Sequence, residues 1–188
     1  MQFSRRIGLI AGLAVAGVAS AATVNVTLLS QLVGHNPDGP GGQGSVIAGY
    51  FKLTVTDTTG VAVGGDIALG NSFNTFCIEI GENLGNGSHV FDVSTQSVQG
   101  GASPFVPQAL VSQTAFLYTQ FRAGTLTSLT GIASFDDTLQ SDVEALQDAL
   151  WFFQNQLGVA DVDDNNTVVL TAKAAAFAAA ANDAVNNG

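Results

Sequence analysis

The spacing of apolar residues changes about halfway along the chain, from every second position to every third or fourth. In the first half, apolar and polar side chains alternate, which predicts strands with one buried face. The segments concerned are residues 24–28, 51–56 and 75–80, with shorter strands expected near 61–69 and at 89–94. We expect the strand at 89–94 to form a hairpin with the strand at 75–80, across a turn at 81–87.

The second half of the chain has the spacing of amphipathic helices. A helix after Pro107 is predicted to end at Gly124, because glycine readily adopts the left-handed conformation of a helix C-cap. A last, alanine-rich helix is predicted from Thr171 to about Val185, with Phe177, Val185 and several alanines to bury.

Between these helices, the sequence SDVE at 141–144 matches a capping box, in which the serine hydroxyl and the glutamate carboxylate bond to amides at the helix start. The helix is expected to run to about Leu157 and to stop at Gly158. On a wheel of about 100° per residue, Gln147 and Gln154 fall on or beside its apolar stripe. Each buried side-chain amide is therefore expected either to form hydrogen bonds with the backbone at a strand end or to be shielded from water because it reacts.

Together these patterns predict an α+β fold in one domain, since 188 residues are enough for a single core. Residues 22–104 are expected to form an antiparallel β-sandwich or barrel of five or more strands. Residues 105–188 are expected to form a helical section.

The N-terminus has the three parts of a secretory signal peptide. Arg5 and Arg6 precede an apolar run at 7–18, and the sequence ASA at 19–21 matches a cleavage site. The alternative is a membrane-spanning helix, but the run is shorter than the roughly 20 residues that a bilayer requires. We expect cleavage near Ala21, a secreted or cell-surface product with no membrane span, and a natural polypeptide that continues beyond Gly188.

The composition of the chain limits the kinds of partner and cofactor that it is expected to bind. The chain has five Lys and Arg and fifteen Asp and Glu, which gives a net charge of −10. Removal of Arg5 and Arg6 with the signal peptide changes this charge to −12. This charge argues against nucleic acid or an anionic membrane surface as a partner. Two histidines and one cysteine are too few for a soft-metal site, and no cofactor is expected.

One acidic segment, at 161–166, has oxygen-bearing side chains in the first positions of a calcium-type loop. They belong to Asp161, Asp163 and Asn165. The segment lacks the glycine at position 6 and the glutamate at position 12 of an EF-hand. We expect a solvated acidic loop here, with a surface calcium site as the alternative.

Cys77 is the only cysteine of a chain predicted to be exported. Such a thiol indicates intermolecular pairing or a chemical role, and the alternative is a small buried apolar residue. Strand alternation places Cys77 with Thr75 and Glu79, opposite Phe76 and Ile78. If Phe76 and Ile78 face the sheet core, the helices of the second half are the candidates to cover the thiol.

Three segments resemble, in order, those of bacterial thioester domains. They are FCIE at 76–79, TAFLY at 114–118 and LQDALW at 146–151, within residues 73–156. Thioester domains occur in Gram-positive surface adhesins and in exported proteins of Gram-negative bacteria with PEP-CTERM sorting tails. Leu146 and Leu150 differ from the usual adhesin residues and resemble the Gram-negative branch more closely.

The resemblance implies that Cys77 and Gln147 supply the two halves of an internal thioester, which an amine on a partner surface would open. In this reading Glu79 is a candidate base for the thiol, and Trp151 would screen the bond from water. The protein would be a covalent adhesin rather than an enzyme. The rival hypothesis is a structural, non-covalent surface module in which Cys77 and Gln147 only pack.

Overall fold

The computed structural model describes residues 22–31, 50–58, 68–78, 88–93, 96, 108–156 and 169–187. They form a mixed fold, with one antiparallel sheet in the N-terminal half and three α-helices in the C-terminal half. The prediction of strands followed by helices is confirmed. The signal peptide expected at 1–21 lies outside the described residues.

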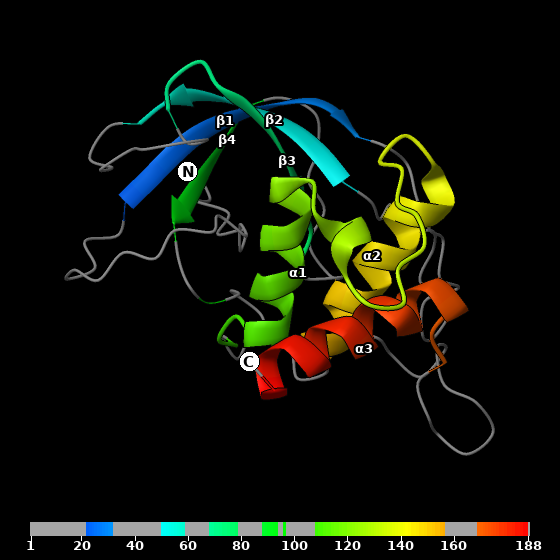
Figure 1. Ribbon diagram of the computed structural model, residues 1–188. Coiled ribbons are helices and arrows are strands. Elements are labelled where there is room, and N and C mark those ends of the chain that lie inside the picture. Colours follow the sequence, from blue (N-terminus) through cyan, green and yellow to red (C-terminus); the bar gives the residue numbers. More distant parts are fainter. Residues whose placement is uncertain are drawn as a thin grey trace, which may run out of the picture.

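The sheet has four strands in the order β3-β2-β1-β4, each antiparallel to its neighbours (Figure 1). The strands are β1 (Ala22–Gln31), β2 (Tyr50–Asp57), β3 (Ser72–Phe76) and β4 (Ser88–Val93). Among the described strands there is this single sheet, so no sandwich, barrel or fifth strand is seen in that part of the chain. Most of the strand expected near 61–69 lies outside it, and residues 68–70 form a turn.

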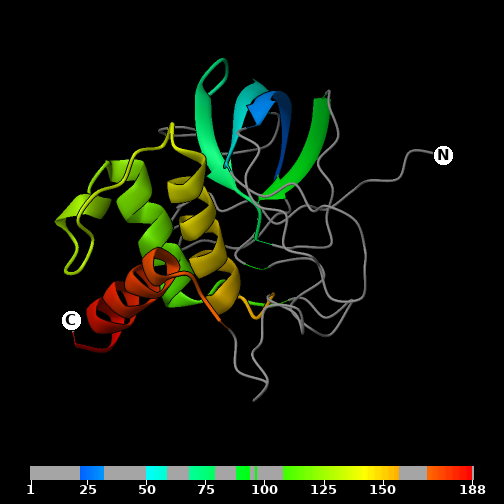
Figure 2. The ribbon, with the colours of Figure 1, turned by 90° about the vertical axis from the view of Figure 1, so that its right-hand side faces the viewer.

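The predicted hairpin between residues 75–80 and 89–94 is wrong. β4 pairs with β1, and the other side of β1 pairs with β2, so β3 and β4 lie at opposite edges of the sheet (Figure 2). Directly after β3, Gln147 of α2 bonds to the Cys77 carbonyl oxygen, and Ile78 is buried in the cluster formed mainly by the helices. Helices, rather than β4, therefore supply the contacts at this end of β3.

One face of the sheet is buried along the border between β2 and β3. The buried side chains on this face are Phe51, Leu53 and Val55 of β2 and Phe73 and Thr75 of β3. On β2 they alternate with Lys52 and Thr56, which are exposed, and with half-buried Thr54. The alternation that predicted β2 is confirmed.

Phe76 and Ile78 lie in the cluster of buried side chains formed mainly by the helices. Thr75, by contrast, is paired with Phe51 on the buried face of the sheet. The condition that Phe76 and Ile78 face the sheet core, on which the expected cover of Cys77 depended, is therefore not met, because the helices bury both residues instead.

Helix α1 (Ser112–Ala123) ends where the sequence predicts. Gly124 has φ 67° and ψ 26°, a left-handed conformation that glycine adopts without steric cost. The amide of Gly124 donates to Phe121 O at 3.0 Å and that of Thr125 donates to Gln120 O at 2.9 Å. The last carbonyls of the helix are thereby satisfied, and the predicted C-cap is confirmed.

Helix α2 (Gln140–Phe153) begins without a side-chain cap, after Leu139. The capping box predicted at Ser141 and Glu144 is wrong, because Ser141 is already inside the helix. The Glu144 carboxylate instead accepts a hydrogen bond from Gln140 Nε2 at 2.7 Å, an i,i+4 pair on the helix surface.

The end of α2 also differs from the prediction, since the helix stops several residues before Leu157. Asn155 has φ 52°, and asparagine is one of the few residues besides glycine that tolerate this conformation. The amide of Gln156 donates to Trp151 O at 2.9 Å, which satisfies a terminal carbonyl of the helix. An asparagine at the αL position therefore terminates α2.

Helix α3 (Ala172–Asn187) matches the predicted alanine-rich helix. Thr171 precedes it, and its hydroxyl oxygen accepts a hydrogen bond from the amide of Ala174 at 3.2 Å, as an N-cap does. Phe177 is fully buried as expected. Val185 is exposed, so the expectation that it packs is wrong.

The three helices pack together on the side of the sheet where β3 lies (Figure 2). Edge-to-face aromatic pairs connect the parts: Phe76 lies 4.9 Å from Phe121, Phe121 lies 6.0 Å from Phe135, and Phe135 lies 6.0 Å from Phe177, measured between ring centroids. A short 3-10 turn, η2 (Leu126–Ser128), follows α1. Within the described chain, no helix has both the length and the apolar character needed to cross a membrane.

Candidate functional site

The candidate site is built on the edge strand β3. Among the described strands, β3 has a neighbour on one side only, so backbone groups on its other side need different partners. Helix α1 supplies two donors to the carbonyl oxygen of Asn74: Tyr118 Oη at 3.2 Å and Arg122 Nη1 at 3.4 Å. These contacts hold α1 against the edge of the sheet.

Helix α2 makes its contact at Cys77, the residue that directly follows β3. Gln147 Nε2 donates a hydrogen bond to the backbone carbonyl oxygen of Cys77 at 2.7 Å. Gln147 is fully buried, as its position on the helical wheel predicted, and Cys77 is half-buried. The structure thus brings together two residues that are 70 positions apart in the sequence.

A third contact links the two helices of the site. Thr114 Oγ1, in α1, donates to the backbone carbonyl oxygen of Leu150, in α2, at 3.5 Å, and both residues are fully buried. The segment at 146–151 therefore bonds to each of the other two segments on which the resemblance rests. Residues 114–118 contact β3 and α2, and residue 147 of α2 contacts the segment after β3.

Along one face of α2, three buried side chains have polar atoms with no hydrogen-bond partner among the described residues. The atoms are Gln147 Oε1, Trp151 Nε1, and Gln154 Oε1 and Nε2. Gln147 and Trp151 are 0% exposed and Gln154 is 1% exposed. An unsatisfied buried polar group costs about 1–3 kcal/mol, so natural proteins keep few of them without a specific reason.

This arrangement suits acyl chemistry. A cysteine thiolate is a strong nucleophile, and a primary carboxamide contains an acyl carbon that a nucleophile can attack. The burial of Gln147 keeps water away from that carbon, and an activated acyl group lasts only where water is excluded.

Other residues singled out in the sequence lie outside the described part of the chain. They are the candidate base Glu79 and the candidate calcium ligands Asp161, Asp163 and Asn165. In the ranges that the structure does describe, no group of three or more His, Cys, Asp and Glu side chains is arranged to hold a metal ion.

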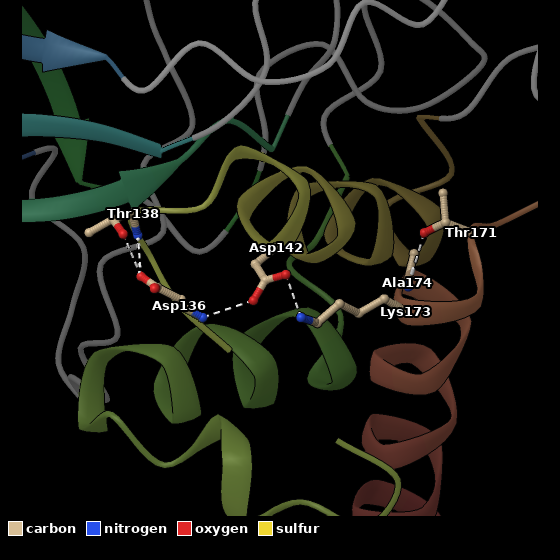
Figure 3. Close-up of polar contacts among 6 residues, drawn as sticks. All are labelled: Asp136, Thr138, Asp142, Thr171, Lys173 and Ala174. Carbon is tan, nitrogen blue, oxygen red and sulfur yellow. Dashed lines mark hydrogen bonds and ion pairs between the residues drawn. The ribbon is translucent and has the colours of Figure 1, made fainter. Parts of the chain in front are cut away.

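A polar contact that no sequence pattern predicted joins α2 to α3 (Figure 3). Asp142, in the first turn of α2, is only 6% exposed and forms an ion pair with Lys173 of α3. Its carboxylate also accepts a hydrogen bond from the backbone amide of Asp136 at 2.9 Å. The available signal was an acidic residue in a first helical turn, where the helix dipole favours negative charge.

The side chain of Asp136 extends this contact into the preceding loop (Figure 3). It accepts hydrogen bonds from the Thr138 hydroxyl at 2.7 Å and from the Thr138 backbone amide at 2.8 Å. Both bonds favour the charged carboxylate, and together they lower the pKa of Asp136 below its ordinary value.

Comparisons of the chain with protein-family models, with curated proteins and with solved structures found no match. A function is therefore inferred from the residues and contacts of the chain itself.

Proposed function

We propose that the mature protein is an exported cell-surface or extracellular-matrix protein that attaches itself covalently to an amine-bearing protein or surface polymer, through a thioester between Cys77 and Gln147. The observation that carries the proposal is the contact between the fully buried Gln147 amide and the Cys77 carbonyl oxygen, at 2.7 Å. A strand-rich half that closes into a sandwich or barrel in the complete chain belongs to the same proposal.

This contact supports the proposal because the sulfur and the carbonyl oxygen of Cys77 are joined through one Cα atom. An amide that touches the oxygen lies within reach of the sulfur after rotation about χ1. Two contacts of α1 add support, since Tyr118 bonds to β3 three residues before Cys77 and Thr114 bonds to α2 three residues after Gln147.

The bond forms when the Cys77 sulfur attacks the side-chain carbonyl carbon of Gln147. A C–S bond replaces the C–N bond, the thiol proton passes to the leaving nitrogen, and ammonia is released. Glu79 would relay the proton, and Trp151 would screen the acyl carbon from water. A primary amine of the partner later attacks the same carbon, forms an amide and returns the thiol, so each domain acylates one target once.

A second candidate function is a structural, non-covalent surface module. The same hydrogen bond favours it, because a glutamine that satisfies the carbonyl after an edge strand has an ordinary structural role. This reading does not account for the buried Gln147 Oε1, which has no hydrogen-bond partner in the described structure.

Intact-mass measurement of the purified chain separates the two. With a thioester, the protein weighs one ammonia less than its sequence, resists thiol alkylation at Cys77, and gains the mass of methylamine when treated with that amine. Cys77→Ala and Gln147→Met should each restore the full sequence mass. Gln154→Met is the matched control, since it removes a second buried amide from the same helix and should leave the ammonia loss intact.

A full sequence mass together with a freely alkylated Cys77 in the wild-type chain would refute the thioester and leave the structural module. Loss of ammonia that persists in Gln147→Met would place the acyl group on another residue.

A further inference from the structure

Two of the buried atoms on α2 without a hydrogen-bond partner in the described chain are complementary. Gln147 Oε1 is an acceptor and Trp151 Nε1 is a donor, and both residues are 0% exposed. The amide nitrogen of Gln147 is already engaged with Cys77, so the oxygen is the part of this amide that lacks a partner.

Helix geometry places the two side chains next to each other. Trp151 follows Gln147 by one turn, which is about 6 Å along the helix axis. Side chains on a helix lean toward its N-terminus, so the indole of Trp151 extends over the turn that carries Gln147. Gln154 lies on the C-terminal side of Trp151 and its side chain leans toward Trp151 by the same geometry, so its Oε1, unpartnered among the described residues, is the rival acceptor that an experiment must separate from Gln147.

We propose that the Trp151 indole N–H donates a hydrogen bond to the Gln147 side-chain oxygen when the acyl carbon reacts, and so acts as the oxyanion donor of the site. This inference rests on the proposed thioester and assigns a catalytic contact to it. In the described structure both atoms lack a partner, so the bond requires a side-chain adjustment between two residues on one helix face.

The donor matters in both acyl-transfer steps. When the Cys77 sulfur adds to the acyl carbon, the π electrons of the carbonyl move to the oxygen, which becomes negatively charged. When this tetrahedral species collapses, the electrons return, the C–N bond breaks, and ammonia leaves with the thiol proton. Attack by the partner amine passes through a similar oxyanion, with the thiolate as the leaving group. A fixed donor in a site without water stabilises both species.

The closeness of the indole to the Gln147 side chain can be measured directly, because Trp151 is the only tryptophan of the chain and gives a single indole N–H resonance. The measurement uses the Cys77→Ala protein, in which the Gln147 amide stays intact. We expect a nuclear Overhauser contact between the indole proton and the Gln147 side chain. Adding Gln147→Met should shift the resonance and speed its exchange with solvent, whereas adding Gln154→Met should leave it unchanged.

The absence of that Overhauser contact, or a resonance that responds to Gln154→Met but not to Gln147→Met, would overturn the inference. The Overhauser measurement needs no change at Gln147, so it decides the pairing even if Gln147→Met does not fold.

The catalytic role is tested with Trp151→Phe, which keeps a buried aromatic ring and removes the N–H. Ammonia loss and methylamine incorporation should each slow by about 100-fold, the scale seen when one oxyanion donor is removed. Leu150→Val is the control for lost packing on the same helix and should change either rate less than about threefold, as it removes no donor. Thermal unfolding checks that both variants are folded.

The outcomes separate this inference from the proposed function. If the wild-type chain loses ammonia and Trp151→Phe does so at the wild-type rate, the oxyanion role is refuted while the thioester stands. If the wild-type chain keeps its full mass, the thioester and the oxyanion role are both refuted.

Discussion

The first turn of α2 and the helix face that follows it differ in whether their buried polar groups have bonding partners among the described residues. Asp142 is nearly buried, yet its carboxylate has a cation from α3 and a backbone amide as partners. One to three turns later, Gln147, Trp151 and Gln154 are buried at least as deeply, and each carries a polar atom without a partner among the described residues.

The difference shows which end of α2 is built for stability. A satisfied buried polar group fixes one arrangement of neighbouring elements, here α2 against α3. An unsatisfied one lowers stability and calls for a specific explanation, which the proposed chemistry would provide. The unsatisfied face is also the one that reaches Cys77 at the edge of the sheet, which is why the proposed chemistry is placed there.

The largest effect is expected at the satisfied end. Asp142→Ala removes the partner of Lys173 and of the Asp136 amide, and should lower the free energy of unfolding by about 2–3 kcal/mol, as measured by denaturant unfolding. The matched control is Asp183→Ala, which removes an exposed carboxylate from α3 and should change stability by less than about 0.5 kcal/mol. Equal effects of the two variants would contradict the comparison.

On the face that carries Gln147, Trp151 and Gln154, removing a polar group should raise the free energy of unfolding instead of lowering it. Gln154→Leu replaces an amide whose two polar atoms have no partner in the described structure by an apolar side chain of similar size, and should raise the free energy of unfolding by about 1–2 kcal/mol. Gln147→Leu also removes an unpartnered oxygen but loses the bond to Cys77, so its net effect should be within about 1 kcal/mol of zero. A clear loss of stability in Gln154→Leu would mean that its amide is satisfied after all.

A smaller effect is expected from the cation of the same contact. Lys173→Met keeps the aliphatic stem and removes the charge, and should lower stability by about 0.5–1 kcal/mol, because the Lys173 side chain is 31% exposed and its ion pair is partly screened. Raising the salt concentration should shrink the difference between wild type and variant. Lys52→Met, at an exposed position of β2, is the control and should show no comparable loss.

The smallest effect is the pH dependence contributed by Asp136. Its pKa is lowered in the folded state, from an ordinary value of 3.8, by the Thr138 hydroxyl and then by the Thr138 amide. The stabilisation is therefore fully present above the ordinary pKa and is lost as the pH falls through the lowered one. Thr138→Ala should raise the pKa of Asp136 toward its ordinary value in an NMR titration, and an unchanged pKa would show that the hydroxyl bond has no effect.

Local patterns predicted the elements that depend on local chemistry. The alternation at 51–56 identified β2, and Gly124 identified the end of α1, since only its own backbone conformation is needed there. The burial of Gln147 also followed from helix periodicity alone. These features depend on residues within a few positions of one another.

Predictions that required a choice between competing partners were less successful. Glu144 had a backbone amide and the Gln140 side chain within reach, and the structure uses Gln140. The strand at β4 had two possible neighbours, and it pairs with β1 rather than with β3. Asn155 carried a signal for the end of α2, although glycine at 158 was the stronger local indication.

By itself, the sequence determined that strands are followed by helices, that α2 carries glutamines on its apolar face, and that the chain has a single thiol. Only the tertiary structure decided that β3 lies at an edge of the described sheet, that α1 bonds to the Asn74 carbonyl oxygen, and that Gln147 reaches Cys77. Periodicity records which face of an element avoids water, but a contact across 70 residues depends on how the elements pack, which no local pattern encodes.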